Sequence, residues 1–70
     1  MIGIFIKNRR QELNISQKQL SENLNISIQR LNNFENESRI PSLIMLGDLS
    51  KYLNFDINNI TPLYPEGKGL

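Results

Sequence analysis

Carboxamide side chains recur at helical spacing in one short stretch, at Gln29, Asn32, Asn33 and Asn36. Each carboxamide places a hydrogen-bond donor and an acceptor in one plane. That arrangement matches the N6 and N7 edge of adenine in the major groove of DNA, and Ile28 is placed to pack on a thymine methyl. These residue types therefore indicate base recognition. The alternatives are a solvated helix face in a chain with ten asparagines and, for Ile28, core packing.

The composition excludes most catalytic chemistry. The chain has 70 residues, a mass of 8.1 kDa, and neither cysteine nor histidine. A domain of about 60 residues buries only about 60% of its unfolded surface, which leaves little room for a deep active-site cavity. Without cysteine and histidine there is no thiolate nucleophile, no zinc–thiolate site and no imidazole base. We therefore expect a protein that is not an enzyme and has no cofactor and no metal site.

The formal net charge of +1 is the sum of two unlike halves. Residues 1–34 hold five basic and two acidic side chains, whereas residues 35–70 hold three basic and five acidic ones. Because most of the carboxamide stretch lies in the positive half, the near-neutral total does not argue against nucleic acid as a ligand. No apolar run approaches the ~20 residues that span a bilayer. We therefore expect a cytoplasmic protein with no membrane association.

Serine residues predict where several helices begin. Ser16 and Ser27 each follow an isoleucine and precede a leucine four positions later, the pattern of a helix cap with a hydrophobic staple. Similar starts occur at positions 42 and 56, and an apolar stripe marks an earlier helix. The predicted helices cover residues 2–13, 17–24, 28–36, 43–53 and 57–62. The expected fold is all-α, with one domain over residues 1–62 and a Pro/Gly-containing tail over residues 63–70.

Only three residues, 25–27, separate the second and third predicted helices. A connection of this length sets two helices at about 90–120° to each other. The apolar residues of the two helices then share one small core. The carboxamides are left on the exposed face of the later helix.

Residues 3–60 resemble the helix-turn-helix domain of the phage repressor and Cro family, also called the Xre family. The positions that fall in register are Gly3, Ile6, Arg10, Leu13, Ser16, Gln17, Leu20, Leu24, Ile26, Ser27, Leu31, Phe34, Glu35, Pro41, Ser42 and Leu53. The resemblance implies a five-helix lambda-repressor-like DNA-binding domain whose helices 2 and 3 form the helix-turn-helix, with helix 3 in the major groove. The DNA-binding residues that we predict are Gln17, Lys18, Ile28, Gln29, Arg30, Asn32, Asn33, Asn36 and Arg39.

The resemblance implies separate roles for these positions. Residues 28, 29, 32 and 33 match base-reading positions. Gln17 matches a glutamine that bonds a phosphate, and Asn36 and Arg39 match contacts to the DNA backbone. Arg10 and Glu35 match an ion pair that ties the first helix to the recognition helix. The alternatives are a helix-cap filler for Gln17 and a loose surface pair for Arg10 and Glu35.

Three positions depart from the family pattern. Ser21 stands where the family usually has alanine, and Asn25 stands where it has glycine at a left-handed turn. Asparagine is the second choice for that backbone conformation. Glu37 stands where a glycine often follows the recognition helix, and it places a negative charge near the expected path of the phosphates.

An apolar cluster near the C-terminal end has two interpretations. Its members are Phe55, Ile57, Ile60, Leu63 and Tyr64. The cluster either closes the core of one domain or forms a dimer interface. We favour the dimer interface, because helix-turn-helix domains usually bind two-fold symmetric sites.

We therefore expect a sequence-specific transcriptional regulator, a repressor, that binds double-stranded DNA as a homodimer on a pseudo-palindromic operator. The alternative is an antitoxin or an N-terminal interaction module of a larger regulator. Its main ligand would be a protein, such as a toxin or a regulatory subunit.

Overall fold

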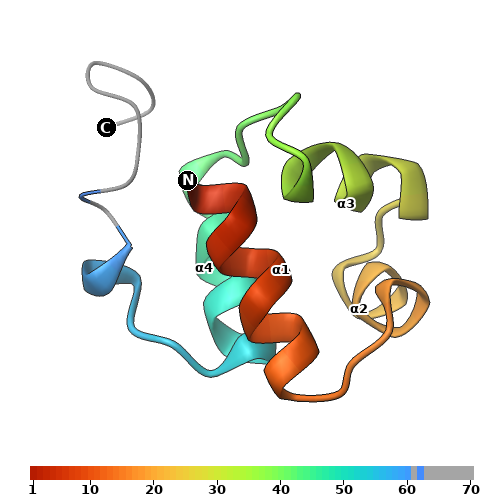
Figure 1. Cartoon of the computed structure of the whole chain (residues 1–70), viewed down its shortest axis with the longest axis horizontal. Helices are drawn as coiled ribbons and strands as arrows, with labels where there is room; N and C mark the ends of the chain where they lie inside the picture. Colours follow the sequence, from red (N-terminus) through yellow and green to blue (C-terminus); the bar gives the residue numbers. More distant parts are fainter. Residues whose placement is uncertain (61, 63–70) are drawn as a thin grey trace.

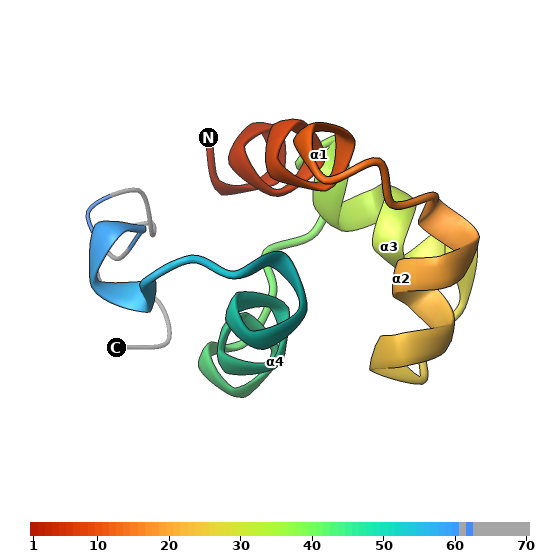
Figure 2. The ribbon, with the colours of Figure 1, turned by 90° about the horizontal axis from the view of Figure 1, so that it is seen from below.

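The computed structural model describes residues 1–60 and 62, and these residues form helices and no strands. The four α-helices are α1 (Ile2–Glu12), α2 (Gln17–Leu24), α3 (Ile28–Glu35) and α4 (Leu43–Leu53), followed by the 3-10 turn η1 (Ile57–Asn59). Helices α1 and α4 lie side by side, and α2 and α3 lie to one side of this pair (Figures 1 and 2). The all-helical fold predicted from the sequence is confirmed.

Serine caps start three of the helices, as predicted. The Ser16 hydroxyl accepts a hydrogen bond from the Gln19 amide (3.0 Å), and the Gln19 side chain accepts one from the Ser16 amide (3.0 Å), which completes a capping box. Ser27 caps α3 and Ser42 caps α4 in the same way, each through its hydroxyl. Because the orphan amides of each first turn gain an acceptor, these caps fix where the helices begin.

One apolar core joins all the helices. Its members with no exposed surface are Ile6, Leu20, Leu31, Leu46, Leu49, Leu53 and Ile60. Every α-helix contributes at least one of them, so no helix is an independent unit. The core therefore holds α2 and α3 in a fixed position relative to α1 and α4.

The start of α1 lies directly against the end of α3. A Cβ atom at Gly3 would lie 2.1 Å from the carbonyl oxygen of Phe34 and 2.9 Å from that of Glu35. Only glycine allows the two backbones to come this close. This contact positions the end of α3 on α1.

The last helical element of the domain is shorter than predicted. The fifth helix, expected over residues 57–62, is the short 3-10 turn η1, capped by the Asp56 carboxylate, which accepts from the Asn58 amide (2.9 Å). Pro62 has no backbone N–H and so cannot extend a helical ladder. Among the described residues of the predicted fifth helix, Ile57–Asn59 form this 3-10 turn.

The apolar cluster near the C-terminal end closes the core in the part that the structure describes. Ile60 is fully buried, so its assignment to a dimer surface is corrected to a core position. Phe55 packs edge to face on Phe5, with ring centroids 5.1 Å apart, and Ile57 packs against the same core. Both are half-buried. Leu63 and Tyr64 lie outside the described residues.

Candidate nucleic-acid interface

Helices α2 and α3 form the helix-turn-helix unit. Asn25 ends α2 in the left-handed conformation (φ 58°), and the Ile26 amide then donates to the Ser21 carbonyl (3.0 Å). Asparagine thus supplies the turn conformation for which the family uses glycine. Leu20, Leu24, Leu31 and Phe34 are buried, and they leave the opposite face of α3 for solvent.

The outward face of α3 carries the predicted base-reading residues. Ile28 is 46% exposed, so it is a surface residue and not part of the core. Gln29 is exposed, and Asn32 and Asn33 are half-buried. The Gln29 Nε2 donates to the Asn33 Oδ1 (3.1 Å), which orders both side chains along the helix. The face is thus polar, uncharged and partly pre-ordered.

Three cations flank this face. Lys18 is exposed in the first turn of α2, Arg30 is exposed on α3, and Arg39 is exposed in the loop before α4. The Arg30 guanidinium lies 5.7 Å from the centroid of the Phe34 ring, a cation–π contact that restrains it. A groove beside α3 contains both arginines and is lined by Ser27, Gln29, Arg30, Asn33, Phe34, Arg39, Ile40 and Ser42. Positive charge therefore borders the carboxamide face.

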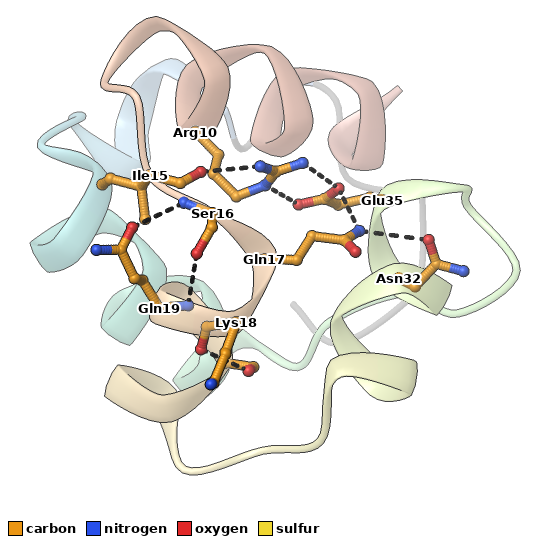
Figure 3. A network of polar contacts seen from close by, with 9 residues as sticks. Arg10, Ile15, Ser16, Gln17, Lys18, Gln19, Asn32 and Glu35 are labelled. Atoms are coloured by element: carbon orange, nitrogen blue, oxygen red, sulfur yellow. Dashed lines mark hydrogen bonds and ion pairs between the residues drawn. The ribbon is translucent and has the colours of Figure 1, made fainter.

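Arg10 and Glu35 form a buried, bidentate ion pair. The Arg10 Nε donates to one carboxylate oxygen of Glu35 (2.6 Å), and its Nη2 donates to the other (3.0 Å). The Arg10 Nη1 also donates to the Ile15 carbonyl (2.9 Å). The pair ties α1 and the loop after it to the end of α3, the positional role that the resemblance implies (Figure 3).

Gln17 adds a link that sequence reasoning missed. Its Nε2 donates to the Glu35 Oε1 (3.1 Å) and to the Asn32 Oδ1 (3.3 Å), so one amide group bridges the ion pair and a base-reading residue (Figure 3). Both side-chain N–H groups of Gln17 are therefore used inside the protein. The donor that Gln17 retains for a phosphate is its backbone N–H, because an N–H group in the first turn of α2 has no helical acceptor. The only sequence signal related to this bridge is that residues 32 and 35 are three positions apart and so share one side of a helix.

Glu37 does not leave an unpaired negative charge beside the interface. Its carboxylate contacts the α-ammonium group of Met1 and accepts from the Ile4 amide (3.3 Å). The hydrogen bond from the α-ammonium lowers the pKa of the Glu37 carboxyl below its usual value of 4.5. Glu37 also has a left-handed backbone (φ 68°), which explains the glycine that often stands at this position in the family.

Asn36 ends α3 and uses its oxygen in the following turn. Its Oδ1 accepts from the Ser38 amide (3.0 Å) and hydroxyl (2.6 Å). The Asn36 Nδ2 is thus the group with which this residue is able to donate to a phosphate. The same turn places the Arg39 amide on the Asn33 carbonyl (3.1 Å), which holds the loop against α3.

Neither a metal centre nor a membrane span is found in residues 1–60 and 62. These residues contain no cluster of three acidic, histidine or cysteine side chains that could hold a metal ion. None of their helices is long and apolar enough to cross a membrane.

Comparisons with known proteins agree with this geometry. The sequence model of the family described as Helix-turn-helix matches residues 6–60. No curated protein matches the chain.

Two solved structures are similar to the chain. One is the master regulator for biofilm formation SinR in complex with DNA, with 28% sequence identity and a TM-score of 0.78 over 86% of this chain and 97% of that one. The other is a complex of the SinR and SinI proteins, with 25% identity and a TM-score of 0.79 over 100% of this chain and 67% of that one.

Proposed function

The chain belongs to the helix-turn-helix family of DNA-binding transcription regulators, and we propose that it is a repressor that binds a pseudo-palindromic operator as a homodimer. The observation that carries this proposal is the outward face of α3. Uncharged carboxamides form that face, Lys18, Arg30 and Arg39 flank it, and the two nearest acids are already paired. This combination suits a helix that lies in the major groove between two phosphate strands.

The proposed interface divides base contacts from backbone contacts. Ile28, Gln29, Asn32 and Asn33 supply apolar and hydrogen-bonding groups for base edges. The α2 amino end with Lys18, together with Arg30, Asn36 and Arg39, supplies phosphate contacts. A similar structure, SinR in complex with DNA, supports this reading of the fold.

We test the function by selection from random double-stranded DNA at physiological salt. The proposal expects one enriched sequence with two inverted half-sites, about one helical turn or ~34 Å apart. Enrichment of a single half-site would contradict the homodimer but not sequence-specific DNA binding. No enrichment of any sequence would contradict the proposed function.

The outward face of α4 is our candidate for the dimer contact. Ile44 is 82% exposed, and Asp48, Lys51 and Tyr52 share its side of the helix, opposite the buried Leu46, Leu49 and Leu53. A two-fold interface places residue i of one copy against residue j of the other, and j against i. Asp48 and Lys51 have no ion pair within the described residues, and such an interface would pair them twice across the axis. The exposed Ile44 and the two charges therefore support a second copy of the chain as the occupant of this face.

Charge exchange tests this dimer contact. Sedimentation equilibrium should show that Asp48→Lys weakens self-association, because two lysines then meet across the axis. The double exchange Asp48→Lys/Lys51→Asp should restore it, and Ile44→Lys should abolish it. Equal self-association in all four proteins would contradict an interface on α4. Circular dichroism serves as the folding control, because exposed substitutions of this kind usually change stability by less than about 0.5 kcal/mol.

A protein partner is a second candidate ligand. One similar structure is a complex of the SinR and SinI proteins, and the whole of this chain aligns with 67% of the matched chain. We propose that this chain also binds a regulatory protein. The test is co-purification of the chain with one protein in a fixed ratio, followed by binding of that complex to the selected duplex. A co-purified protein that leaves the affinity for this duplex unchanged would contradict a regulatory partner.

A further inference from the structure

We propose that Glu35 fixes the orientation of the Asn32 carboxamide through Gln17, so that Asn32 presents N–H donors, and not its oxygen, to the major groove. This inference rests on the proposed function, because it names the chemistry by which one position of α3 selects bases. It assigns Gln17 as a positioning residue. Three hydrogen-bonded side chains, those of Glu35, Gln17 and Asn32, determine this orientation (Figure 3).

The carboxylate of Glu35 is the fixed acceptor at one end of these hydrogen bonds. Its side chain is almost fully buried, and the Arg10 guanidinium binds both of its oxygens. An ion-paired carboxylate has no proton to donate, so it accepts every hydrogen bond that it makes. Any amide that contacts it must turn its nitrogen toward it.

The amide of Gln17 is the second of these three groups. It lies 3.1 Å from the Glu35 Oε1, and the acceptor-only carboxylate therefore fixes its Nε2 on that side. The reversed amide would place two oxygens against each other in a partly buried site. Such an unsatisfied contact is costly where water has little access.

The carboxamide of Asn32 is the third of these groups. The same Gln17 Nε2 lies 3.3 Å from Asn32, and its second proton needs an acceptor there. The Asn32 Oδ1 therefore faces Gln17, and its Nδ2 faces away from Gln17. Reversal of Asn32 alone would oppose two NH₂ groups, and reversal of both amides is blocked by Glu35.

A neighbouring pair shows why the charge matters. Gln29 and Asn33 form the same kind of amide–amide hydrogen bond (3.1 Å), with no carboxylate at either end. Both of these amides can reverse together without losing their hydrogen bond. Gln29 and Asn33 are therefore adaptable readers, whereas Asn32 is held in one orientation.

The fixed orientation predicts a base preference. An outward NH₂ group needs an acceptor, which guanine, adenine and thymine offer in the major groove. Cytosine offers only its N4 amino donor there. The position that Asn32 contacts should therefore disfavour cytosine by about tenfold, the usual effect of one unpaired hydrogen-bonding group.

The variant Asn32→Ala first identifies the base pair whose preference depends on Asn32. The test then compares binding to four duplexes that differ only at that base pair. The wild-type chain should bind the cytosine duplex about tenfold more weakly than the other three. Asn32→Asp has nearly the same shape but only acceptors, so it should bind the cytosine duplex best. Gln17→Met keeps the side-chain length but has no amide, so the discrimination against cytosine should fall to about twofold.

Controls separate this inference from other roles of Gln17. Gln29→Met should leave the preference at the Asn32 position unchanged, and Gln17→Ala gives a second, smaller replacement at the bridging position. If Gln17→Met weakens binding to all four duplexes by the same factor, the discrimination against cytosine does not depend on Gln17 and the inference is overturned. If the wild-type chain selects no DNA sequence at all, the proposed function fails, which is a distinct outcome.

Discussion

Glu35 pairs with Arg10 on one side and with Gln17 on the other, so a single buried carboxylate serves both stability and orientation. The sequence resemblance implies the pair with Arg10, and the structure contains it. The bridge by Gln17 was not predictable, because it depends on the distance between two helices that are set by the turn at residues 25–27. The side-chain donors of Gln17, which the resemblance assigns to a phosphate, are used inside the fold.

The ion pair makes a prediction about stability. Arg10→Met leaves the Glu35 carboxylate buried without its cation and should lower the free energy of unfolding by about 3–5 kcal/mol, as for other broken buried pairs. The double variant Arg10→Met/Glu35→Leu removes both charges and should recover most of that loss. Urea unfolding measures both. A loss in the double variant that equals the sum of the two single losses would show that the pair contributes no coupling.

Glu37 makes a prediction about pH. Contact with the α-ammonium of Met1 lowers its pKa in the folded state, so the contact stabilises the fold above the unfolded pKa of about 4.5 and the effect disappears as the pH falls through the lower folded pKa. Thermal melts from pH 6 to pH 2 should therefore show a smaller acid-induced loss for Glu37→Gln than for the wild-type chain. Glu22→Gln, at an exposed site on α2, is the matched control. Equal acid sensitivity of Glu37→Gln and the wild type would contradict the contact.

At the scale of elements, the sequence predicted the four α-helices and the serine caps of three of them because those signals are local. The hydroxyl of Ser16 and the left-handed Asn25 act within a few residues of their positions. The fifth predicted helix is present in the described residues as a short 3-10 turn, because the apolar spacing from residue 57 onward serves core closure by Ile60 and not helix length. The dimer assignment failed at Ile60 for the same reason, since burial is a property of the whole packing.

Two glycines test how closely the helices pack. Gly3→Ala places a methyl group within 3 Å of two carbonyl oxygens of α3, so it should destabilise the fold by about 1–3 kcal/mol and disturb the end of the recognition helix. Gly47→Ala, inside α4, meets nothing within 4 Å and should stabilise the fold by about 0.5–1 kcal/mol. Thermal unfolding at low protein concentration gives both values. Equal shifts in the same direction would refute the contact between α1 and α3.

At the scale of the whole molecule, the net charge of +1 is small because a positive half, residues 1–34, and a negative half, residues 35–70, nearly cancel. Glu35 and Glu37 are both paired, so in the proposed complex Lys18, Arg30 and Arg39 would face DNA without opposing charge from these acids. The sequence count of acids and bases indicated a positive half, but the pairing of Glu37 became visible only in the fold. We therefore expect weak nonspecific binding to DNA, with selectivity that depends on the carboxamide face and on the geometry of the proposed dimer.

In the proposed complex, the outward face of α3 reads bases while the flanking cations bind phosphates. The most direct measurement is the affinity of Gln29→Ala and Arg39→Ala for the selected duplex and for a random duplex, over a range of salt concentrations. Gln29→Ala should lose about 1–3 kcal/mol on the selected duplex and almost nothing on the random one. Arg39→Ala should lose affinity for both and lower the salt slope by about one. Equal losses of Gln29→Ala on both duplexes would contradict base reading by α3.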